Sequence, residues 1–274
     1  MAQSGPNTVQ SPHAEPIEGE TIPRRQPLTR DGFKATPEDG CETLYDILIR
    51  SARKFGGEKG FGTRKLLKKH VETQKVRKVV DGHEQYIDKD WTYSQLTGYV
   101  WTTFSDYVEQ SLQIGSGLRK LGLAKGDIVH LYAATSMHWL SMAHGAVSQS
   151  MPITTAYDTL GEEGLTHSLD ATKAKLMFLD APLLKTLIEP LQKSKYLQIL
   201  VYNEDSNLVQ ADVDLLLKIH PHLTVLSYEE LRECGEDNSC GPVPPSSEDT
   251  CCIIHASGQF SRKLVNRLCT NIIS

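Results

Sequence analysis

The chain has 274 residues, of which 39 % are hydrophobic and 23 % charged, a length and composition typical of a globular protein with one large domain or two modest ones. Its formal net charge of −5 excludes a general electrostatic attraction to nucleic acid or to anionic lipid, so any such contact requires a local patch. No run approaches the roughly eighteen consecutive apolar residues of a membrane-spanning helix. The N-terminus lacks the basic start and apolar stretch of a secretory signal.

The cysteines show neither the regular spacing of a disulfide framework nor the paired C-x-x-C spacing of a zinc site. This pattern favours a reducing, intracellular location, either cytoplasmic or in peripheral contact with a membrane. The thiols are then interpreted as small buried or incidental side chains. The six residues are Cys41, Cys234, Cys240, Cys251, Cys252 and Cys269.

The first forty residues are rich in proline, glycine and polar residues, which predicts an irregular N-terminal arm over residues 1–40. The next segment, "TLYDILIRSARKF" (residues 43–55), has apolar side chains at helical spacing and basic ones on the other face. It therefore predicts an amphipathic helix.

A β-hairpin is predicted over "VRKVVDGHEQYI" (residues 76–87). Asp81-Gly82 separates two β-prone runs there, and both turn positions tolerate positive φ. A long helix is predicted to follow over residues 93–122, with Gly122 as its terminator.

One local patch of positive charge lies in "TRKLLKKHVETQKVRK" (residues 63–78), where Glu72 is the single acidic residue. It could contact an anionic membrane surface or an acidic ligand. A solvated face of the hairpin is the favoured interpretation, because charged runs are usually exposed. The basic residues are Arg64, Lys65, Lys68, Lys69, Lys75, Arg77 and Lys78.

From residue 127 onward, strand patterns alternate with helix patterns. This alternation predicts an α/β fold, namely an incomplete doubly wound, mainly parallel sheet with helices on both faces, preceded by the irregular arm and the β-hairpin. The predicted strands are 127–133, 151–157, 175–180, 197–203, 223–228 and 251–257, and the predicted helices are 136–150, 161–172, 182–194 and 213–219.

The predicted helix 136–150 has no charged residue apart from two histidines, so it should be buried on most sides. His138 and His144 are six residues apart, which places them on different helix faces and excludes the i, i+4 geometry of a metal-binding pair. We expect both to be ordinary hydrogen-bonded histidines.

In a parallel sheet, ligands bind beyond the carboxyl ends of the strands, where helix N-termini supply backbone N–H donors. One candidate is the group after the strand at 151–157. The favoured interpretation is that Thr159 or Asp158 caps the next helix, with Glu162 and Glu163 in its first turn near the positive end of the dipole. The candidate ligand-contacting residues are Thr154, Thr155, Tyr157, Asp158 and Thr159.

The second candidate follows the predicted strand at 251–257, where Ser257 and Gly258 resemble the first residues of a phosphate-binding loop. Such a loop needs glycines for close backbone approach, hydroxyls and usually a lysine. A serine-glycine pair by itself is common after strands, so this pair alone is a weak signal.

Several segments together resemble the N-terminal part of a fungal long-chain fatty-acyl-CoA synthetase, a member of the adenylate-forming superfamily. They are "TLYDILIRSARKFG", "GTRKLLKKHVE", "WTYSQLTGY", "HPHLTVLSYEEL", "EDTCCII" and the long central segment "GSGLRKLGLAKGDIVHLYAATSMHWLSMAHGAVSQSMPITTAYDTLGEEGLTHSL". The resemblance covers most of residues 17–258.

This resemblance implies a two-step reaction. A fatty acid carboxylate attacks ATP, with Mg²⁺, to give an acyl-adenylate and pyrophosphate, and the thiol of coenzyme A then displaces AMP. Fatty acid, ATP and coenzyme A are therefore the implied partners, and ATP and Mg²⁺ the implied cofactors. No nucleic acid is expected.

In this family "EDTCCII" runs into a loop of the type Y-T-S-G-S-T-G-x-P-K-G. Ser257 and Gly258 match its first Ser-Gly, but the next three residues do not match Ser-Thr-Gly, and Leu264 stands at the lysine position. The matching pair is therefore predicted to be the remnant of a nucleotide-binding site. No residue of the chain is predicted to be catalytic or to bind a metal.

We therefore expect three parts: the arm 1–40, the N-terminal part of an AMP-binding domain over residues 41–258, and a divergent tail over residues 259–274 that reads like another reading frame or an intron. The residues after Gly258 do not continue the family's phosphate-binding loop, and positioning of the reacting groups supplies most of this catalysis. The chain by itself is therefore expected to be an inactive fragment of the ligase. The alternatives are a non-catalytic fragment that pairs with a full-length synthetase, or a gene-model product without function. A sheet interrupted here is also expected to present an apolar strand edge.

Overall fold

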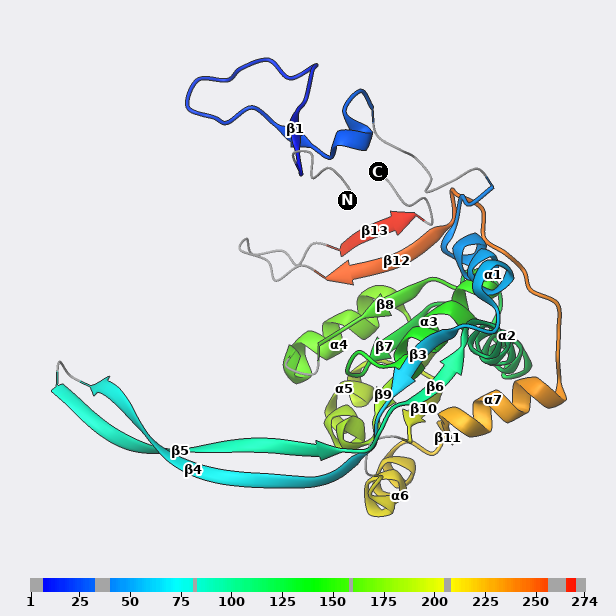
Figure 1. Ribbon diagram of the computed structural model, residues 1–274. Helices are drawn as coiled ribbons and strands as arrows, with labels where there is room; N and C mark the ends of the chain where they lie inside the picture. Colours follow the sequence, from blue (N-terminus) through cyan, green and yellow to red (C-terminus); the bar gives the residue numbers. More distant parts are fainter. Residues whose placement is uncertain are drawn as a thin grey trace.

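The computed structural model describes residues 7–32, 40–80, 83–157, 160–204, 208–255 and 265–269. At its centre is a sheet with the strand order β11-β10-β9-β7-β8-β12-β13, in which the first six strands are parallel (Figure 1). These six are β7 (Val129–Tyr132), β8 (Ile153–Thr155), β9 (Leu176–Asp180), β10 (Ile199–Asn203), β11 (Thr224–Ser227) and β12 (Thr250–His255).

Helices cover both faces of this sheet, which confirms the predicted doubly wound α/β fold. On one face lie α3 (Met137–Ser148) and α7 (Tyr228–Asp237), both packed against α2 (Phe104–Lys120). The helices of the other face are α4 (Gly161–Thr172), α5 (Ile188–Lys193) with the preceding 3₁₀ segment η3 (Ala181–Leu187), and α6 (Gln210–Ile219).

Strand β9 shows why two helical layers are needed. Its side chains alternate between faces, so Leu176 and Phe178 enter one apolar core while Met177 and Leu179 enter the other. All four are fully buried. A strand that is apolar on both faces is stable only when both are covered.

Helix α2 approaches its neighbours closely because glycines lie at the contacts. A Cβ atom built on Gly235 of α7 would lie 1.8 Å from the Gln113 carbonyl oxygen, and one on Gly117 would lie 2.4 Å from the Leu231 carbonyl oxygen. A Cβ on Gly145 of α3 would lie 2.6 Å from the Ile114 side chain. These close approaches of the glycine backbone fix the spacing of the helical layer.

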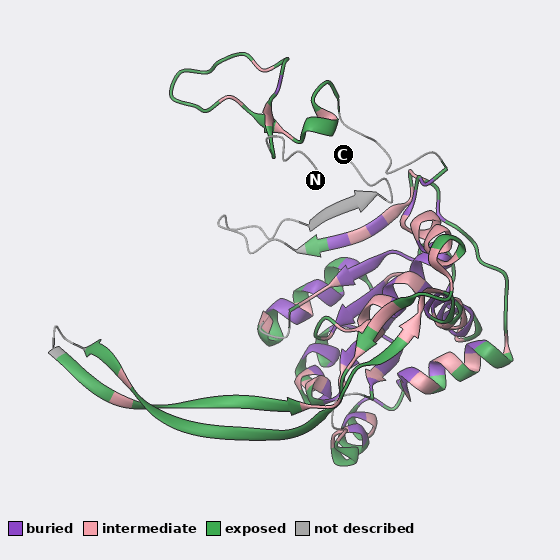
Figure 2. Cartoon of the chain, in the orientation of Figure 1, coloured by how far each residue is buried: buried purple, intermediate pink, exposed green. Residues whose placement is uncertain are grey.

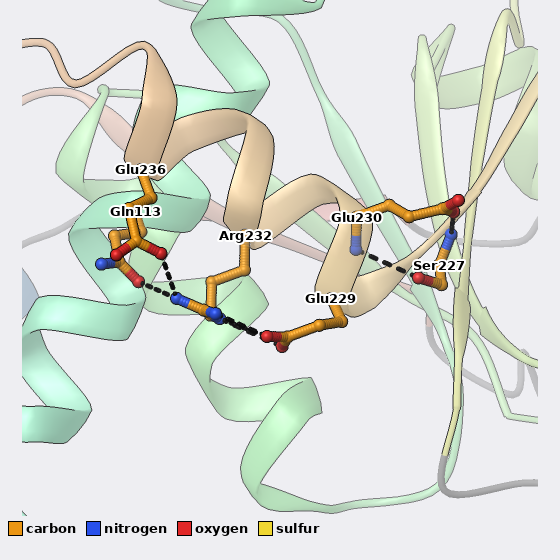
Figure 3. A network of polar contacts seen from close by, with 6 residues as sticks. All are labelled: Gln113, Ser227, Glu229, Glu230, Arg232 and Glu236. Atoms are coloured by element: carbon orange, nitrogen blue, oxygen red, sulfur yellow. Dashed lines mark hydrogen bonds and ion pairs between the residues drawn. The ribbon is translucent and has the colours of Figure 1, made fainter.

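Helix α7 was not predicted. The pattern "LTVLSY" indicated a strand over 223–228, but β11 ends at Ser227, whose side chain begins α7. Its hydroxyl accepts from Glu230 N at 3.0 Å, and the Glu230 carboxylate accepts from Ser227 N at 2.6 Å, a capping box (Figure 3). The signal was present in the sequence as S-Y-E-E.

A four-residue polar network joins α7 to α2. The Arg232 guanidinium donates to the carboxylates of Glu229 and Glu236 and to the Gln113 side chain at 2.7 Å (Figure 3). The hydrogen bonds from Arg232 lower the pKa of Glu229. This network therefore holds the outer face of the helix pair that the glycines bring together.

The N-terminal part contains the arm and the predicted first helix, α1 (Leu44–Phe55), which a capping box between Thr43 and Asp46 begins. Over residues 7–32, which the structure describes, the arm is irregular except for the short antiparallel pair β1 (Val9–Gln10) and β2 (Arg24–Arg25) and the 3₁₀ turn η1 (Pro27–Thr29).

The predicted hairpin is present and much longer than expected. It consists of β4 (Leu66–Val80) and β5 (His83–Leu96), and extends away from the sheet and its helices (Figure 1). Its predicted turn residues, Asp81 and Gly82, lie outside the described residues. We call β4 and β5 together the ribbon.

The helix predicted over 93–122 was wrong in its first part. Residues up to Leu96 belong to β5, and Val100–Thr103 form β6, which pairs with β3 (Lys59–Thr63). The helix begins at Phe104 because the Thr103 side chain accepts from Asp106 N at 3.2 Å. The β-branched and aromatic residues before this cap instead pair with distant strands.

The expected open edge at β12 is paired. Strand β13 (Val265–Cys269) runs antiparallel to β12, so β12 has hydrogen-bonded neighbours on both sides. Within the described residues, no helix has the length and apolar character needed to cross a bilayer. Among the described cysteines, Cys41, Cys234, Cys240 and Cys252 are free thiols.

We expect Gly235→Ala to lower the free energy of unfolding by about 2 kcal/mol or more, because the new methyl group can be accommodated only by separating α7 from α2. Urea unfolding followed by circular dichroism measures this. Gly241→Ala is the matched control, since a Cβ at Gly241 would meet nothing within 4 Å. Equal stability of the two variants would contradict the close α2–α7 contact.

Candidate functional site

The candidate site lies at the carboxyl ends of the parallel strands. Strand β7 leads into α3 on one face, whereas β8 and β9 lead into helices on the other face. Connections that leave neighbouring strands on opposite faces open a crevice at the carboxyl ends. A cavity of about 460 Å³ occupies this position beside β7, β8 and β12.

The cavity is largely apolar, with a few hydroxyl groups at its wall. In the described part of the chain, no charged side chain lines it. Such a wall suits a ligand with an apolar portion and polar groups that the hydroxyls orient. The lining residues are Ala133, Ala134, Thr135, Trp139, Ile153, Thr155, Ala156, Tyr157, Cys252 and Ile254.

The structure divides the first group of predicted site residues. Thr155 and Tyr157 line the cavity, and Tyr157 is well exposed. Thr154 does not, because it is buried and its hydroxyl donates to the Ile253 carbonyl at 3.0 Å. That hydrogen bond ties β8 to β12 and is a structural role.

The residue at which α4 begins is neither of the two residues that were expected to cap it. The N-cap residue is Leu160, which makes no side-chain cap hydrogen bond. Asp158 and Thr159 lie outside the described residues. Glu162 and Glu163 are in the first turn, as predicted.

The second predicted pair, Ser257 and Gly258, also lies outside the described residues. In the sequence, Ile254, a wall residue of the cavity, comes three positions before Ser257. The side chain of Ile254 remains 41 % exposed. Burial raises the pKa of the neighbouring Cys252 thiol to about 11, so this thiol is neutral near pH 7 and unsuited to act as a nucleophile.

A polar network that was not predicted from the sequence binds the segment that follows β7, which forms part of the cavity wall. The Asp180 carboxylate accepts from Ala134 N at 2.8 Å and from the Asn203 side-chain amide at 2.9 Å. Asp180 and Asn203 are direct register partners at the carboxyl ends of β9 and β10. A signal was present, since both strands end in a polar residue after an apolar run.

The network continues into α3 and α7 through a histidine. The His138 Nδ1 lies 2.9 Å from the side-chain oxygen Oδ1 of Asn203, and the His138 ring stacks on Tyr228 at 4.1 Å between centroids. The Tyr228 hydroxyl lies 2.7 Å from the Ser141 hydroxyl. His138 is therefore a hydrogen-bonded structural residue, as predicted.

His144 has the same kind of role elsewhere on α3. Its Nδ1 lies 2.8 Å from the Tyr107 hydroxyl. Burial raises the pKa of Tyr107 and lowers the pKa of His144 to about 4. Both groups are therefore neutral near pH 7, and the tautomer of the imidazole determines which of them donates the hydrogen bond.

The described residues do not fit the implied Mg²⁺ ion. Among them, no group of three or more histidines, cysteines or carboxylates is placed to hold a metal, and the cavity wall contains no carboxylate. Mg²⁺ requires oxygen ligands that usually include one or two carboxylates. The wall hydroxyls could hydrogen-bond an organic ligand but do not form a metal site.

The fold and the cavity define an α/β domain with a cavity beyond the carboxyl ends of a parallel sheet. Residues 76–259 match the family model described as "AMP-binding enzyme", which is more than half of the chain. The chain therefore belongs to the AMP-binding enzyme family.

Its curated relatives include fungal fatty-acid ligases. Long-chain-fatty-acid–CoA ligase 1 of Schizosaccharomyces pombe is 40 % identical over 245 residues, which are 89 % of this chain and 36 % of that protein. A palmitoyl-CoA ligase of Gibberella moniliformis is 37 % identical over 269 residues, 98 % of this chain and 38 % of that protein. The chain thus spans little more than a third of the length of these relatives, and it is homologous to long-chain fatty acid–CoA ligases.

A solved structure confirms the fold. The adenylation domain of a carboxylate reductase from Mycobacterium chelonae superposes with a TM-score of 0.67 at 16 % sequence identity, covering 86 % of this chain and 36 % of that chain. At this identity the likeness shows the architecture alone.

We expect Asp180→Ala to release the Ala133–Thr135 segment, because Ala134 N and the Asn203 amide lose their shared acceptor. Hydrogen exchange at the Ala134 amide should become about tenfold faster or more, and stability should fall by about 1–3 kcal/mol. Asp170→Ala, at an exposed position of α4, is the control. An unchanged Ala134 exchange rate would show that Asp180 does not hold the wall.

We expect the protein to lose stability as the pH falls from about 6.5 toward 4. His144 is neutral when folded in this range, whereas in the unfolded chain it takes up a proton, and the unfolded state is favoured accordingly. Urea unfolding across this pH range should show a shallower loss for His144→Gln than for the unchanged chain. His222→Gln, at an exposed histidine, should keep the original slope, and parallel slopes for all three proteins would refute this origin.

Proposed function

We propose that this chain is the N-terminal part of the adenylate-forming domain of a long-chain fatty acid–CoA ligase. The observation that carries the proposal is the 37–40 % identity to curated fungal ligases over nearly the whole chain, together with a family match that runs to residue 259. Because this match ends at residue 259, it also supports the proposed boundary at residue 258 between the family sequence and the tail. The complete enzyme would join a fatty acid to coenzyme A at the expense of ATP.

The lining of the described cavity supports a specific assignment of its wall residues to the apolar and polar groups of a ligand. Its apolar wall, with Trp139, Cys252 and Ile254, would contact apolar groups, while Thr135, Thr155 and Tyr157 offer hydroxyls. Ser257 and Gly258 would begin the phosphate contacts. Because this pair follows the wall residue Ile254 by three and four positions in the sequence, the chain would present ATP and substrate at the carboxyl ends of the strands.

The 274-residue chain by itself is proposed to catalyse neither step. A cavity without a charged wall residue in the described part of the chain can bind and orient a ligand, but it supplies no group to stabilise charge on a transferring phosphoryl oxygen. In the cell, we propose a peripheral contact with a membrane, made by the ribbon.

The test compares the chain with a chimera. ATP–pyrophosphate exchange with palmitate is expected to stay at background for the chain. Residues 1–258 fused to the downstream part of the Schizosaccharomyces pombe relative are expected to give exchange and palmitoyl-CoA. Exchange by the chain alone would contradict its proposed inactivity, and a folded chimera without activity would contradict the ligase assignment.

A pair of variants in that chimera tests the cavity. Thr155→Trp fills the space beside β8 and is expected to reduce exchange at least about tenfold, since even a small misplacement of reacting groups is costly. Ala124→Trp adds the same side chain at an exposed position before β7 and should leave exchange unchanged. Equal activities would place the substrate elsewhere.

A further inference from the structure

The ribbon has an exposed surface on both sides and no described strand beside it. It forms a two-stranded sheet of its own, and nearly all of its residues whose burial is described are exposed (Figure 2). A two-stranded hairpin by itself is marginally stable in water. The ribbon, which is exposed on both sides, therefore offers a surface to which a partner can bind.

The strand register assigns each side chain to one of two faces. Directly opposed residues of an antiparallel pair share a face, and successive residues alternate. Given the pairs Glu72↔Trp91 and Lys75↔Asp88, one face carries the even-numbered residues of 68–78 and the odd-numbered residues of 85–95. We call it the aromatic face, and the opposite one, which begins with Lys69, the mixed-charge face.

The two faces differ in charge. On the mixed-charge face three basic residues are matched by three acidic ones, a net charge of zero, and Arg77 forms an ion pair with Glu84. On the aromatic face three lysines stand against one glutamate, a net charge of +2. The charged residues of the aromatic face are Lys68, Lys78, Lys89 and Glu72.

The aromatic face also carries a row of apolar side chains, which the opposed polar pair Gln74 and Lys89 interrupts. Trp91 and Tyr93 are 40 % and 48 % exposed, and the opposed pair Val76 and Ile87 extends the row toward the tip. The Lys89 ammonium lies 4.3 Å from the centroid of the Trp91 ring. Tryptophan and tyrosine combine an apolar ring with a polar edge, the property that places them at the interface between a membrane and water.

We propose that the aromatic face of the ribbon binds an anionic lipid surface, with Trp91 and Tyr93 inserted at headgroup depth and the lysines over the lipid charges. The face has the same composition as an amphipathic interfacial helix, apolar rings flanked by lysine, built here on a sheet. The mixed-charge face then remains in water. This inference specifies the peripheral contact proposed above, and it does not depend on ligase activity.

The test is co-sedimentation of the full chain with vesicles of phosphatidylcholine, with and without phosphatidylserine. Binding is expected only with phosphatidylserine and should weaken as salt is added, because the lysines act through screened charge. Absence of phosphatidylserine-dependent binding would overturn the proposal. Because the readout is vesicle binding, its failure is distinct from failure of the exchange assay.

Two matched double variants distinguish the faces. Trp91→Ser with Tyr93→Ser should weaken vesicle binding about tenfold or more, whereas Val71→Ser with Tyr86→Ser, two exposed residues of the mixed-charge face, should change it less than about threefold. Equal losses would overturn the proposal. If the first pair instead altered self-association and left vesicle binding intact, the aromatic face would be a protein-binding surface and the proposal wrong.

Charge variants provide a second comparison that does not remove apolar side chains. Lys89→Glu and Lys75→Glu change the net charge equally, but Lys89 belongs to the aromatic face and Lys75 to the mixed-charge face. Lys89→Glu should weaken binding about tenfold or more and Lys75→Glu at most about threefold. Circular dichroism confirms that each variant keeps the fold, and equal effects in folded variants would refute a face-specific contact.

Discussion

Burial of both faces of the central parallel strands is the constraint on which the rest of the structure depends. Strands β9 and β10 lie between neighbours on both sides, and their successive side chains enter two separate apolar cores. Neither face can be left to water, so two layers of helix are required. The glycines of α2, α3 and α7 then let three helices pack closely enough to close one of those layers.

The same constraint positions the candidate site. Helices that must cover opposite faces leave β7 and β8 in opposite directions, and the space between their first residues becomes the cavity. Backbone groups released at the strand ends need partners there. Asp180 and Asn203 meet that need by joining the Ala133–Thr135 segment to the ends of β9 and β10. The wall of the site is therefore held by the sheet rather than by the ligand.

The ribbon is not subject to this constraint. It contributes no strand to the central sheet and no side chain to the two described apolar cores that flank that sheet. What its register determines is the partition of charge and aromatic surface between two faces. Cross-strand pairing neutralises one face and leaves the other with an excess of lysine beside Trp91 and Tyr93.

The sequence by itself determined the fold class, the alternation of strands and helices from residue 127, the first helix and the existence of a hairpin, because these rest on local periodicity and turn chemistry. It also determined the resemblance to long-chain fatty acid–CoA ligases, carried by specific residues up to Gly258. Only the tertiary structure decided that Val100–Thr103 form a strand with Lys59–Thr63, that Thr154 is buried while Thr155 and Tyr157 reach the cavity, and that Asp180, Asn203 and His138 form one network. Each of these depends on contacts between residues distant in the chain, and local pattern carries no information about which distant partner a residue will meet.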